Sequence, residues 1–283
     1  MNLSSSANSN PPKRNLAITI VPVLLVLITF LFWYQTWFGR RLSDSEMTEC
    51  LTETSAPHKT QHALAQLAER MAHGDAAARR WYPQVVTLAG SKESGLRLMA
   101  AWVMGQDNKS PEFHEALRKL LDDPEPMVRG NAALALARFG DASGRAQLQA
   151  MLRPFTLTAP QAGTPSFRQK EGDDVRNGGI VARLQTGPAL SGIDVLSPVA
   201  GTLDRRLAAD GAHVAAGDPI AILSPGEEQV WESLRALYLV GTPDDLEDVE
   251  RFARQPTGMS DRVRQQAALT AAAIRQRAQA RIP

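Results

Sequence analysis

The sequence predicts an α+β multidomain protein with one N-terminal transmembrane helix, an α-solenoid of helical hairpins, and a small all-β barrel inserted into the solenoid. Three observations predict this fold class. Residues 16–38 form an apolar run without a charge. Alanine-rich helical patterns occur on both sides of the chain's middle, in 44–153 and 227–280. Between them, residues 156–225 contain short apolar segments separated by glycines, which is typical of strands joined by tight turns.

The composition is that of a globular protein without a strong overall charge. The chain has 283 residues, 43% of them hydrophobic, which is enough for one large domain or a few small ones. Its 31 Lys and Arg residues nearly balance 30 Asp and Glu residues, so no global field indicates nucleic acid or an acidic substrate as a partner. Cys50 is the single cysteine, so the fold must depend on packing and not on an internal disulfide.

The first residues differ in character from the rest. Residues 1–15 are polar and rich in Ser and Pro, and we expect them to be disordered. As a helix rising about 1.5 Å per residue, the uncharged segment 16–38 would cross a hydrocarbon core of roughly 30 Å. Aromatic residues at its distal end, followed by Arg40 and Arg41, favour a membrane interface. A cleavable signal peptide is the alternative, although its apolar region would be shorter and would end in small residues.

Short amphipathic helices are predicted over residues 44–153. The segment HKTQHALAQLAERMAHG places Leu64, Leu67 and Met71 on one face of a helix that ends at a glycine. The next segment, DAAARRWYPQVVTLAG, begins at a capping aspartate, and its Pro83 implies either a kink or a late start.

A repeated pattern unites these helices. In DDPEPMVRGNAALALARFGD, prolines beside acidic residues precede alanines that let one helix lie close to its neighbour, and LRLMAAWVMGQD matches it at an offset of about 32 residues. The pattern returns in SDRVRQQAALTAAAIRQRA, where Val263 and Arg264 match Val128 and Arg129. These segments resemble HEAT repeats, especially those of the phycobilisome-lyase type, which implies a stacked array that binds other proteins. Whether the two helical segments form one continuous solenoid stays open.

The β-type segment is an internal duplication with an offset of about 38 residues. Neither half can bury both of its faces alone, so two halves closing on each other would form a small flattened barrel. The alignment pairs glycines that we expect in tight turns: Gly163 with Gly201, Gly172 with Gly211, and Gly178 with Gly217.

The second half, SPVAGTLDRRLAADGAHVAAGDPIAIL, resembles the biotinyl/lipoyl domain. It is still more similar to the barrel-sandwich hybrid of HlyD-type periplasmic adaptor (membrane fusion) proteins, which implies that fold. In carrier domains of this kind, a lysine in the hairpin between the halves holds the cofactor. The connection from Gln185 to Gly192 contains no lysine, and the nearest, Lys170, lies inside the first half. We therefore expect no cofactor. The long helical hairpin typical of adaptors is also missing from this connection.

No catalytic or metal-binding pattern is predicted. His58 and His62 are spaced i and i+4, but neither an HExxH pattern nor a third ligand accompanies them, so a polar helix face is favoured. His213 follows a predicted turn, and the HxH pair of lysostaphin-type zinc peptidases is absent. Cys50 has no catalytic partner nearby. The sequence also lacks a phosphate-binding loop and a GxSxG motif, so we expect a protein that is not an enzyme.

An arginine-rich segment near the C-terminus could be interpreted as a nucleic-acid or lipid surface: Arg262, Arg264, Arg275, Arg277 and Arg281. Without interleaved aromatic residues, a solvated helix face is favoured instead. Part of its charge would pair with acidic residues one helix earlier: Asp244, Asp245, Glu247, Asp248 and Glu250.

The sequence thus predicts a non-catalytic adaptor or scaffold that binds protein partners, in a transport or secretion complex. By resemblance we expect a single-pass protein of the bacterial inner membrane, attached through residues 16–38, with its bulk in the periplasm. Self-association is expected by the same resemblance, and nucleic acid is not expected as a partner. The alternative is an accessory subunit of a biotin- or lipoyl-dependent enzyme complex at the membrane. A third interpretation, a chaperone for a bound pigment, lacks a Cys or His pocket.

Overall fold

The computed structural model describes residues 22–30, 41–187, 192–254 and 258–280. The chain divides into two compact units, Met1–Glu46 and Met47–Pro283. In the first unit, residues 22–30 form a helix with exposed side chains. Ser43 precedes the helix α2 (Asp44–Thr52) and forms a capping box, because its backbone N–H donates to Glu46 Oε2 at 2.9 Å and its hydroxyl oxygen accepts from the backbone N–H of Glu46 at 3.4 Å.

The prediction of a transmembrane helix is wrong for the part of 16–38 that the structure describes. The described helical residues 22–30, at about 1.5 Å per residue, extend over less than half of the roughly 30 Å of a hydrocarbon core. Across the described ranges, no helix combines the length and the apolar character needed to cross a membrane. The remainder of 16–38 and all of 1–15 lie outside those ranges, and the cellular location stays a prediction.

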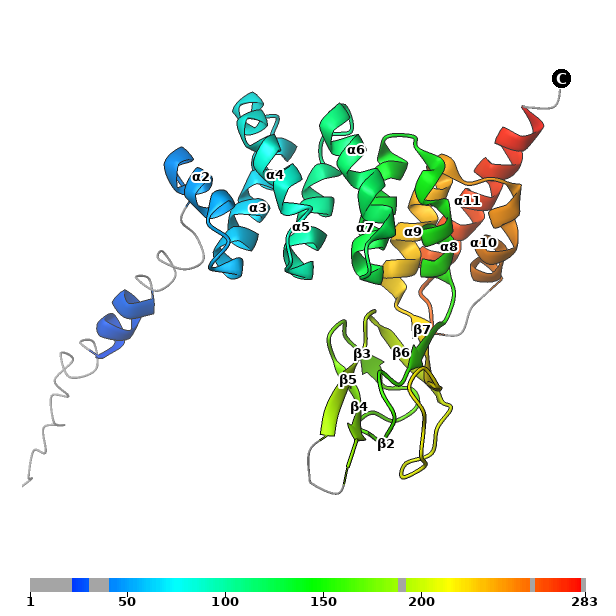
Figure 1. Ribbon diagram of the computed structural model, residues 1–283. Coiled ribbons are helices and arrows are strands. Elements are labelled where there is room, and N and C mark those ends of the chain that lie inside the picture. Colours follow the sequence, from blue (N-terminus) through cyan, green and yellow to red (C-terminus); the bar gives the residue numbers. More distant parts are fainter. Residues whose placement is uncertain (1–21, 31–40, 188–191, 255–257, 281–283) are drawn as a thin grey trace, which may run out of the picture. The chain divides into compact units, whose positions relative to one another are not determined.

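The helices of the second unit form two layers (Figure 1). In one layer each helix packs on the next: α3 (Pro57–Ala72), α5 (Ser94–Met104), α7 (Pro126–Arg138), α9 (Glu227–Val240) and α11 (Asp261–Gln279). The other layer contains α4 (Tyr82–Leu88), α6 (Pro111–Lys119), α8 (Arg145–Leu152) and α10 (Leu246–Ala253). Short 3-10 turns flank several of these helices: η1 (Ala76–Trp81), η2 (Leu120–Asp122), η3 (Ala142–Gly144) and η4 (Pro243–Asp245).

Prolines determine where several of these helices begin. Pro57, Pro111 and Pro126 are the first residues of α3, α6 and α7, where a missing backbone N–H has no partner to lose. Pro83 lies in the first turn of α4, directly after η1. Of the two effects that the sequence allowed for Pro83, the structure therefore has the late start and not a kink.

The helices before and after the β strands form one continuous array. Both α7 and α8 pack on α9, although a β segment separates them from it in the sequence. Leu148 and Leu152 of α8 share a hydrophobic core with Val230 of α9. Within that core, the buried Ser233 Oγ donates to the carbonyl of Leu148 at 2.7 Å. The question that the sequence left open is thus answered: the β segment is an insertion in one solenoid.

A polar contact recurs between successive hairpins of the array. Tyr82 in α4 donates to Asp107 Oδ2 ahead of α6, at 2.9 Å and a separation of 25 residues. His114 Nε2 in α6 lies 2.8 Å from Asp141 Oδ2 ahead of α8, at a separation of 27 residues. Burial, together with Asp107, raises the pKa of Tyr82 to about 12. Burial would also raise the pKa of Asp141, but hydrogen bonds from Ser143 and His114 outweigh it and hold that pKa below its usual value.

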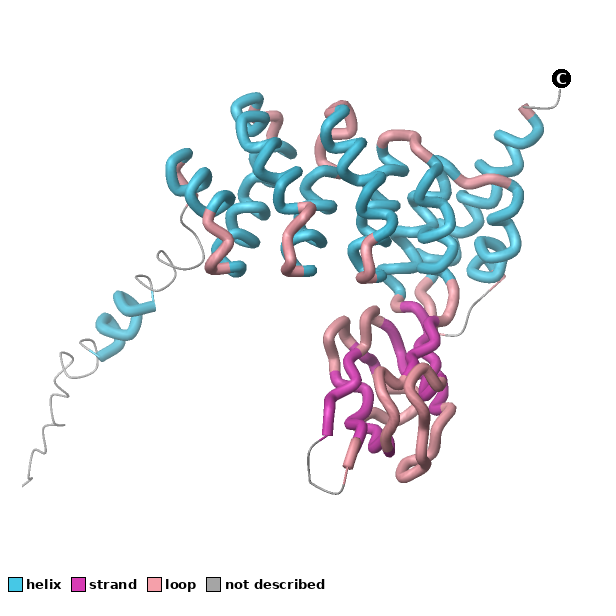
Figure 2. The backbone as a smooth tube through the Cα atoms, in the orientation of Figure 1, coloured by secondary structure: helices cyan, strands magenta, loops and turns pink. Residues whose placement is uncertain are grey.

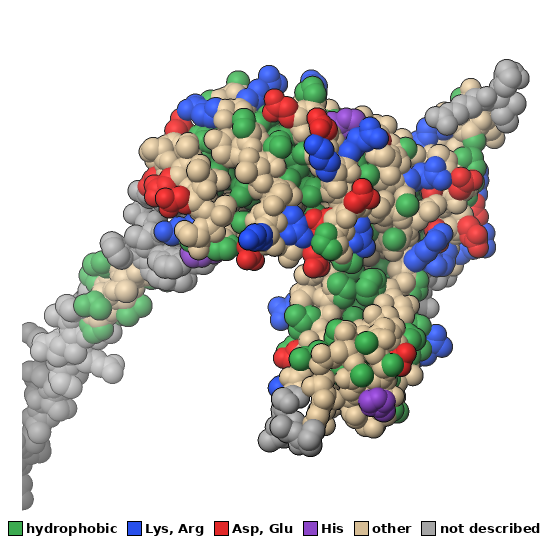
Figure 3. Space-filling model, in the orientation of Figure 1, with side chains coloured by type: hydrophobic (Ala, Val, Ile, Leu, Met, Phe, Trp, Pro, Cys, Tyr) green, Lys and Arg blue, Asp and Glu red, His purple; other side chains and the backbone are tan. Residues whose placement is uncertain are grey.

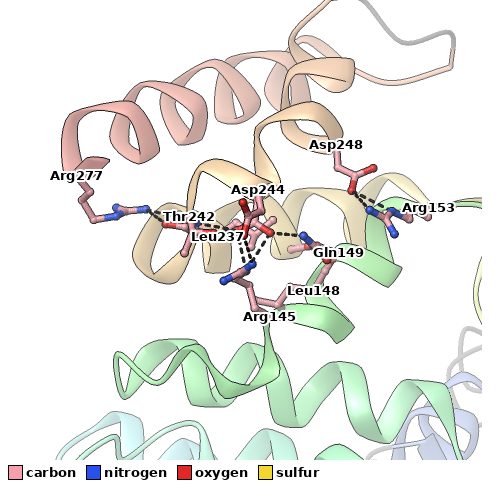
Figure 4. A network of polar contacts seen from close by, with 12 residues as sticks. Arg145, Leu148, Gln149, Arg153, Leu237, Thr242, Asp244, Asp248 and Arg277 are labelled. Atoms are coloured by element: carbon pink, nitrogen blue, oxygen red, sulfur yellow. Dashed lines mark hydrogen bonds and ion pairs between the residues drawn. The ribbon is translucent and has the colours of Figure 1, made fainter. Parts of the chain in front are cut away.

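The same contact spans the insertion, within the polar network of Figure 4. Arg145 Nε in α8 donates to Asp245 Oδ1 at 3.2 Å, at a separation of 100 residues because the β segment lies between them. Asp245 is fully buried and also accepts a hydrogen bond from Gln149 Nε2. Arg153 pairs with Asp248 at 2.7 Å. These contacts bind α8 to η4 and α10, and so join the two helical segments.

The inserted segment, which we call the β module (residues 155–225), consists of two small antiparallel sheets over a shared core (Figure 2). Its strands are β1 (Phe155–Thr158), β2 (Thr164–Phe167), β3 (Asp174–Val175), β4 (Ile180–Gln185), β5 (Gly192–Leu196), β6 (Gly201–Arg206) and β7 (Pro219–Pro225). One sheet has the order β1-β7-β6-β3 and the other β2-β4-β5. Phe155 of β1 lies opposite Leu223 of β7, so the chain leaves and re-enters the helical array through neighbouring strands.

The two halves of the β module form equivalent contacts with each other. Val175 pairs with Gly201 in the first sheet, and the equivalent residues Val214 and Gly163 form an isolated bridge beside the second. Four turn glycines with positive φ each donate a backbone hydrogen bond to the opposite half: Gly172 to Leu203, Gly211 to Pro165, Gly178 to Ser197 and Gly217 to Ala159. Donors and acceptors are both related by the duplication offset of about 38 residues, so the module has an internal two-fold arrangement.

Candidate functional site

Large apolar side chains are exposed at one place on the helical array. In the described helices from Met47 onward, the exposed side chains of this kind are Trp102 (42%), Tyr238 (45%), Leu239 (51%) and Leu269 (59%). They belong to α5, α9 and α11, and all of them line two adjacent hollows. Scattered apolar residues are normal on a protein surface, but gathered ones indicate a binding surface.

The two hollows form a groove across four helices of one layer. One hollow has a volume of ≈ 320 Å³ and is lined by α7, α9 and α11. The other has a volume of ≈ 230 Å³ and is lined by α5, α7 and α9. Leu134, Arg138 and Glu232 line both, which joins the hollows into one surface that we call the groove. Since α5 and α7 precede the β module and α9 and α11 follow it, neither helical segment forms the groove alone.

One residue of each of these helices occupies the same position in the repeat, at a constant offset from the first buried residue of its helix: Trp102 in α5, Leu134 in α7, Ala236 in α9 and Leu269 in α11. The side chain is large in three of the helices and small in α9. Ala236 is 5% exposed and lines the larger hollow between Leu134 and Leu269. The hollow is therefore a gap in a row of apolar side chains.

The charged side chains of the groove are paired, with one exception. Arg262 lies 2.6 Å from Glu228, and Arg235 lies 3.3 Å from Glu232. Arg138 Nη1 donates to the backbone carbonyl that follows α5, at 3.2 Å, and Arg138 forms no ion pair with any residue that the structure describes. Figure 3 shows basic and acidic side chains interspersed over the helices on the face drawn. The groove is thus an apolar surface with one positive charge that lacks an acidic partner within the described chain.

A larger hollow of ≈ 560 Å³ lies between α4 and α6 on the other layer. Its lining includes Glu112, Glu115 and Lys119, and none of the exposed large apolar side chains. Lys119 and Glu115 form an ion pair at 2.8 Å. The groove, and not this larger hollow, gathers the exposed large apolar side chains of the array, and gathered apolar side chains indicate a binding surface.

The predicted turn glycines belong to the β module, and none of them lines the groove. Gln185 ends β4 and Gly192 begins β5; of the connection between them, residues 188–191 lie outside the described residues. Lys170 lies in the turn between β2 and β3, where its backbone N–H donates to Asp173 Oδ2 at 2.7 Å. The lysine nearest to the connection is therefore placed in a different turn.

The predicted histidines and the cysteine do not come together. His58 and His62 lie in the first two turns of α3, and His62 Nε2 is 2.8 Å from Gln66 Nε2. His213 is exposed in a turn of the β module, and Cys50 is half-buried in α2. Over the described ranges, no group of three or more His, Cys, Asp or Glu side chains could hold a metal ion.

The C-terminal arginines are largely engaged within the array. Arg277 donates to three carbonyls at the end of α9, at 2.6, 3.3 and 3.0 Å, which satisfies groups that a helix end leaves open. Three others form ion pairs with nearby acidic side chains: Arg262, Arg264 and Arg275. Arg281 lies outside the described residues.

Sequence reasoning missed the groove. It did not single out Trp102, Arg138 or Tyr238 as binding residues. A signal was present, because Trp102, Leu134 and Leu269 share one repeat position beside paired small residues. A large side chain that recurs at one position of an array can form a row on its surface as well as fill its interior.

A family model for HEAT repeats matches residues 82–154. The HEAT-repeat interpretation is therefore confirmed for that part of the chain. The resemblance of the β module to biotinyl/lipoyl and HlyD-type domains stays a prediction.

Two solved structures show limited likeness. A single-chain, multi-domain long-chain acyl-CoA carboxylase is 26% identical over 35% of this chain and 10% of its own, with a TM-score of 0.24. An engineered protein is 17% identical over 82% of this chain and 80% of its own, with a TM-score of 0.41. This chain spans only a tenth of the carboxylase, and neither likeness supports an argument about function. A search of curated proteins finds no match.

Proposed function

We propose that the protein is a non-catalytic scaffold that binds protein partners through the groove formed by α5, α7, α9 and α11. HEAT repeats are in general protein-interaction modules, and residues 82–154 match them. One observation carries the proposal: the exposed large apolar side chains of the described helices from Met47 onward all gather in this groove. Apolar and aromatic side chains of this kind supply most of the binding energy of protein interfaces.

The β module is proposed to be a second, rigid interaction element of the same scaffold. Its rigidity is supported by the equivalent hydrogen bonds that its two halves exchange. A role without a cofactor is supported by the connection from Gln185 to Gly192, which lacks a lysine. The resemblance to periplasmic adaptors supports a place in a transport or secretion complex. An acylated lysine would instead favour the accessory subunit of a biotin- or lipoyl-dependent complex.

Site-specific photo-crosslinking tests the proposal. A photoreactive amino acid replaces Trp102 or Leu269 in the groove, and replaces Glu115 on the other layer as the control, because the Glu115 side chain is 73% exposed. After irradiation in cells, both groove positions should cross-link to the same protein and position 115 should not. That protein is identified by mass spectrometry, purified, and titrated against the wild-type chain and Trp102→Ala.

Equal cross-linking from position 115, or binding that Trp102→Ala leaves unchanged, would contradict the proposal. The same mass spectra report whether any lysine of the chain is acylated, which decides between the scaffold and the accessory subunit of a carrier-dependent enzyme.

A further inference from the structure

We propose that the groove binds a short amphipathic helix of its partner, with two large apolar side chains that enter the two hollows and a carboxylate between them that pairs with Arg138. The inference rests on the proposed function and deepens it, because it states the chemistry of the partner segment.

The gap in the apolar row indicates that the partner supplies a large apolar side chain. At the row position, Leu134 and Leu269 flank Ala236, and the space that a larger side chain would fill is the hollow of ≈ 320 Å³. This volume is close to the lower end of ligand sites, roughly 300 Å³, and is large enough for one or two side chains of a partner. A large apolar side chain of the partner would complete the row and bury the exposed faces of Leu239 and Leu269.

Charge complementarity indicates that the partner supplies a carboxylate. The two glutamates of the groove, Glu228 and Glu232, already have arginine partners at 2.6 and 3.3 Å. Arg138 lines both hollows and has no ion-pair partner among the described residues. A carboxylate that reaches it would remove the uncompensated charge from a surface that the partner covers. A basic partner residue would meet Arg138 without any free glutamate to balance it.

The spacing of the hollows indicates a helix. The hollows lie on successive helices of one layer, and packed helices are about 8–10 Å apart. Residues i and i+7 of an α-helix lie on one face about 10.5 Å apart, at 1.5 Å per residue. A helix laid across α7 and α9 therefore places i and i+7 over the two hollows. Residue i+4 then faces Arg138, which lines both.

Labelled synthetic peptides test the inference with the full chain, with fluorescence anisotropy as the readout. Three alanine-based peptides carry Leu at i and i+7 and differ at i+4, which is Glu, Gln or Lys. A fourth carries Glu at i+4 but Ala at both leucine positions. The Glu peptide should bind about fivefold more tightly than the Gln peptide and about tenfold more tightly than the Lys peptide. The peptide without leucine should not bind.

Protein variants locate the contacts. In Arg138→Glu the preference should reverse, so that the Lys peptide binds best. Arg118→Glu is the matched control, because Arg118 is an exposed arginine in the last turn of α6 on the other layer, and it should change nothing. Ala236→Leu fills the hollow with the residue present at the equivalent positions 134 and 269, and should abolish binding of all leucine peptides. Leu239→Glu, at a side chain that is 51% exposed, blocks the hollow independently of folding effects at position 236.

The outcomes separate the inference from the proposed function. Equal binding of the Glu, Gln and Lys peptides would overturn the pairing with Arg138. Binding that survives both Ala236→Leu and Leu239→Glu would overturn the use of the hollow. If no leucine peptide binds, while the cross-linked partner still depends on Trp102, the inference is wrong and the scaffold proposal stands.

Discussion

Arg145 and Asp245 form an ion pair, with Nε 3.2 Å from Oδ2, between the last helix before the β module and the turn that follows the first helix after it. The equivalent pair one hairpin earlier, His114 and Asp141, is separated by 27 residues instead of 100. The two pairs occupy the same place in the repeat. They differ only in the number of residues between the two partners. The helical array therefore keeps its repeat geometry across the insertion.

Removing the buried carboxylate of this pair is expected to destabilise the array. Asp245→Ala should lower the free energy of unfolding by roughly 2–4 kcal/mol, because fully buried Asp245 accepts hydrogen bonds from Arg145, Gln149 and the backbone N–H of Thr242. Asp244 is the matched control, since it pairs with the same arginine at 3.1 Å but its side chain is 80% exposed. Asp244→Ala should change stability by less than about 1 kcal/mol. Urea unfolding followed by circular dichroism measures both, and equal losses would contradict this account.

The β module is expected to be dispensable for the folding of the helices. Phe155 lies opposite Leu223 in adjacent strands, so a short Gly-Ser linker in place of residues 155–225 can join α8 to α9. The shortened chain should keep its helical circular dichroism and one cooperative unfolding transition. It should also retain the groove and its leucine-peptide binding. Two separate transitions would show that the module holds the helical segments together, contrary to the continuous core that joins α8 and α9.

Two glycines of the β module are expected to tolerate no side chain. A Cβ atom on Gly201 would overlap the carbonyl oxygen of Ser224, and one on Gly163 would overlap that of Gln185. Each alanine substitution should cost about 1–3 kcal/mol, because a backbone atom and not a flexible side chain must move. Gly187→Ala is the control, since nothing lies within 4 Å of its added Cβ. Amide hydrogen exchange should show the loss in the strands of the module and not in the helices; equal protection in all three variants would contradict the prediction.

The parts of this fold that sequence could predict are those that leave a local pattern. Val128 and Arg129, followed by paired alanines, recur at fixed spacing, and a family model recognises the same repeat over residues 82–154. The transmembrane helix was predicted from the length of an uncharged run and from the aromatic and basic residues at its distal end. A run without charge is necessary for a membrane helix but does not determine the length of the helix, and no helix of the described residues is long and apolar enough to cross a membrane.

The groove depends on relations that no local pattern contains. In the sequence, Ala236 looks like an ordinary alanine of a buried helix. Because α9 stacks between α7 and α11, this small side chain leaves a gap between two leucines. Asp245 likewise belonged, by sequence, to an acidic stretch that was expected to pair with the C-terminal arginines. It is fully buried because the stacking of the repeats places α8 beside η4, and sequence could not pair residues that the insertion separates by 100 positions.

The acid stability of the array is expected to depend on a second contact between hairpins. Arg97 Nε lies 2.6 Å from Asp123 Oδ2, and Arg97 Nη2 lies 2.9 Å from Oδ1, while Asp123 is 7% exposed. Burial alone would raise the pKa of Asp123, but hydrogen bonds from Arg97 and from the backbone N–H of Glu125 outweigh it and lower that pKa. The pKa of Asp123 in the folded state lies below the unfolded value of about 3.9. Its contribution to the free energy of unfolding is therefore fully present above that pH and is lost as the pH falls through the folded pKa.

Comparing the wild-type chain with Asp123→Asn separates the contribution of Asp123 to stability from the contributions of the other carboxylates. At neutral pH the variant should be less stable by about 2–4 kcal/mol, because Arg97 loses its buried partner. Below about pH 4 the wild-type free energy of unfolding should fall more steeply than that of the variant, so that the two converge. Urea titrations at a series of pH values provide the measurement, with Asp122→Asn as a control at the exposed neighbouring aspartate. Parallel curves for wild type and Asp123→Asn would show that the low pKa of Asp123 does not contribute to folding.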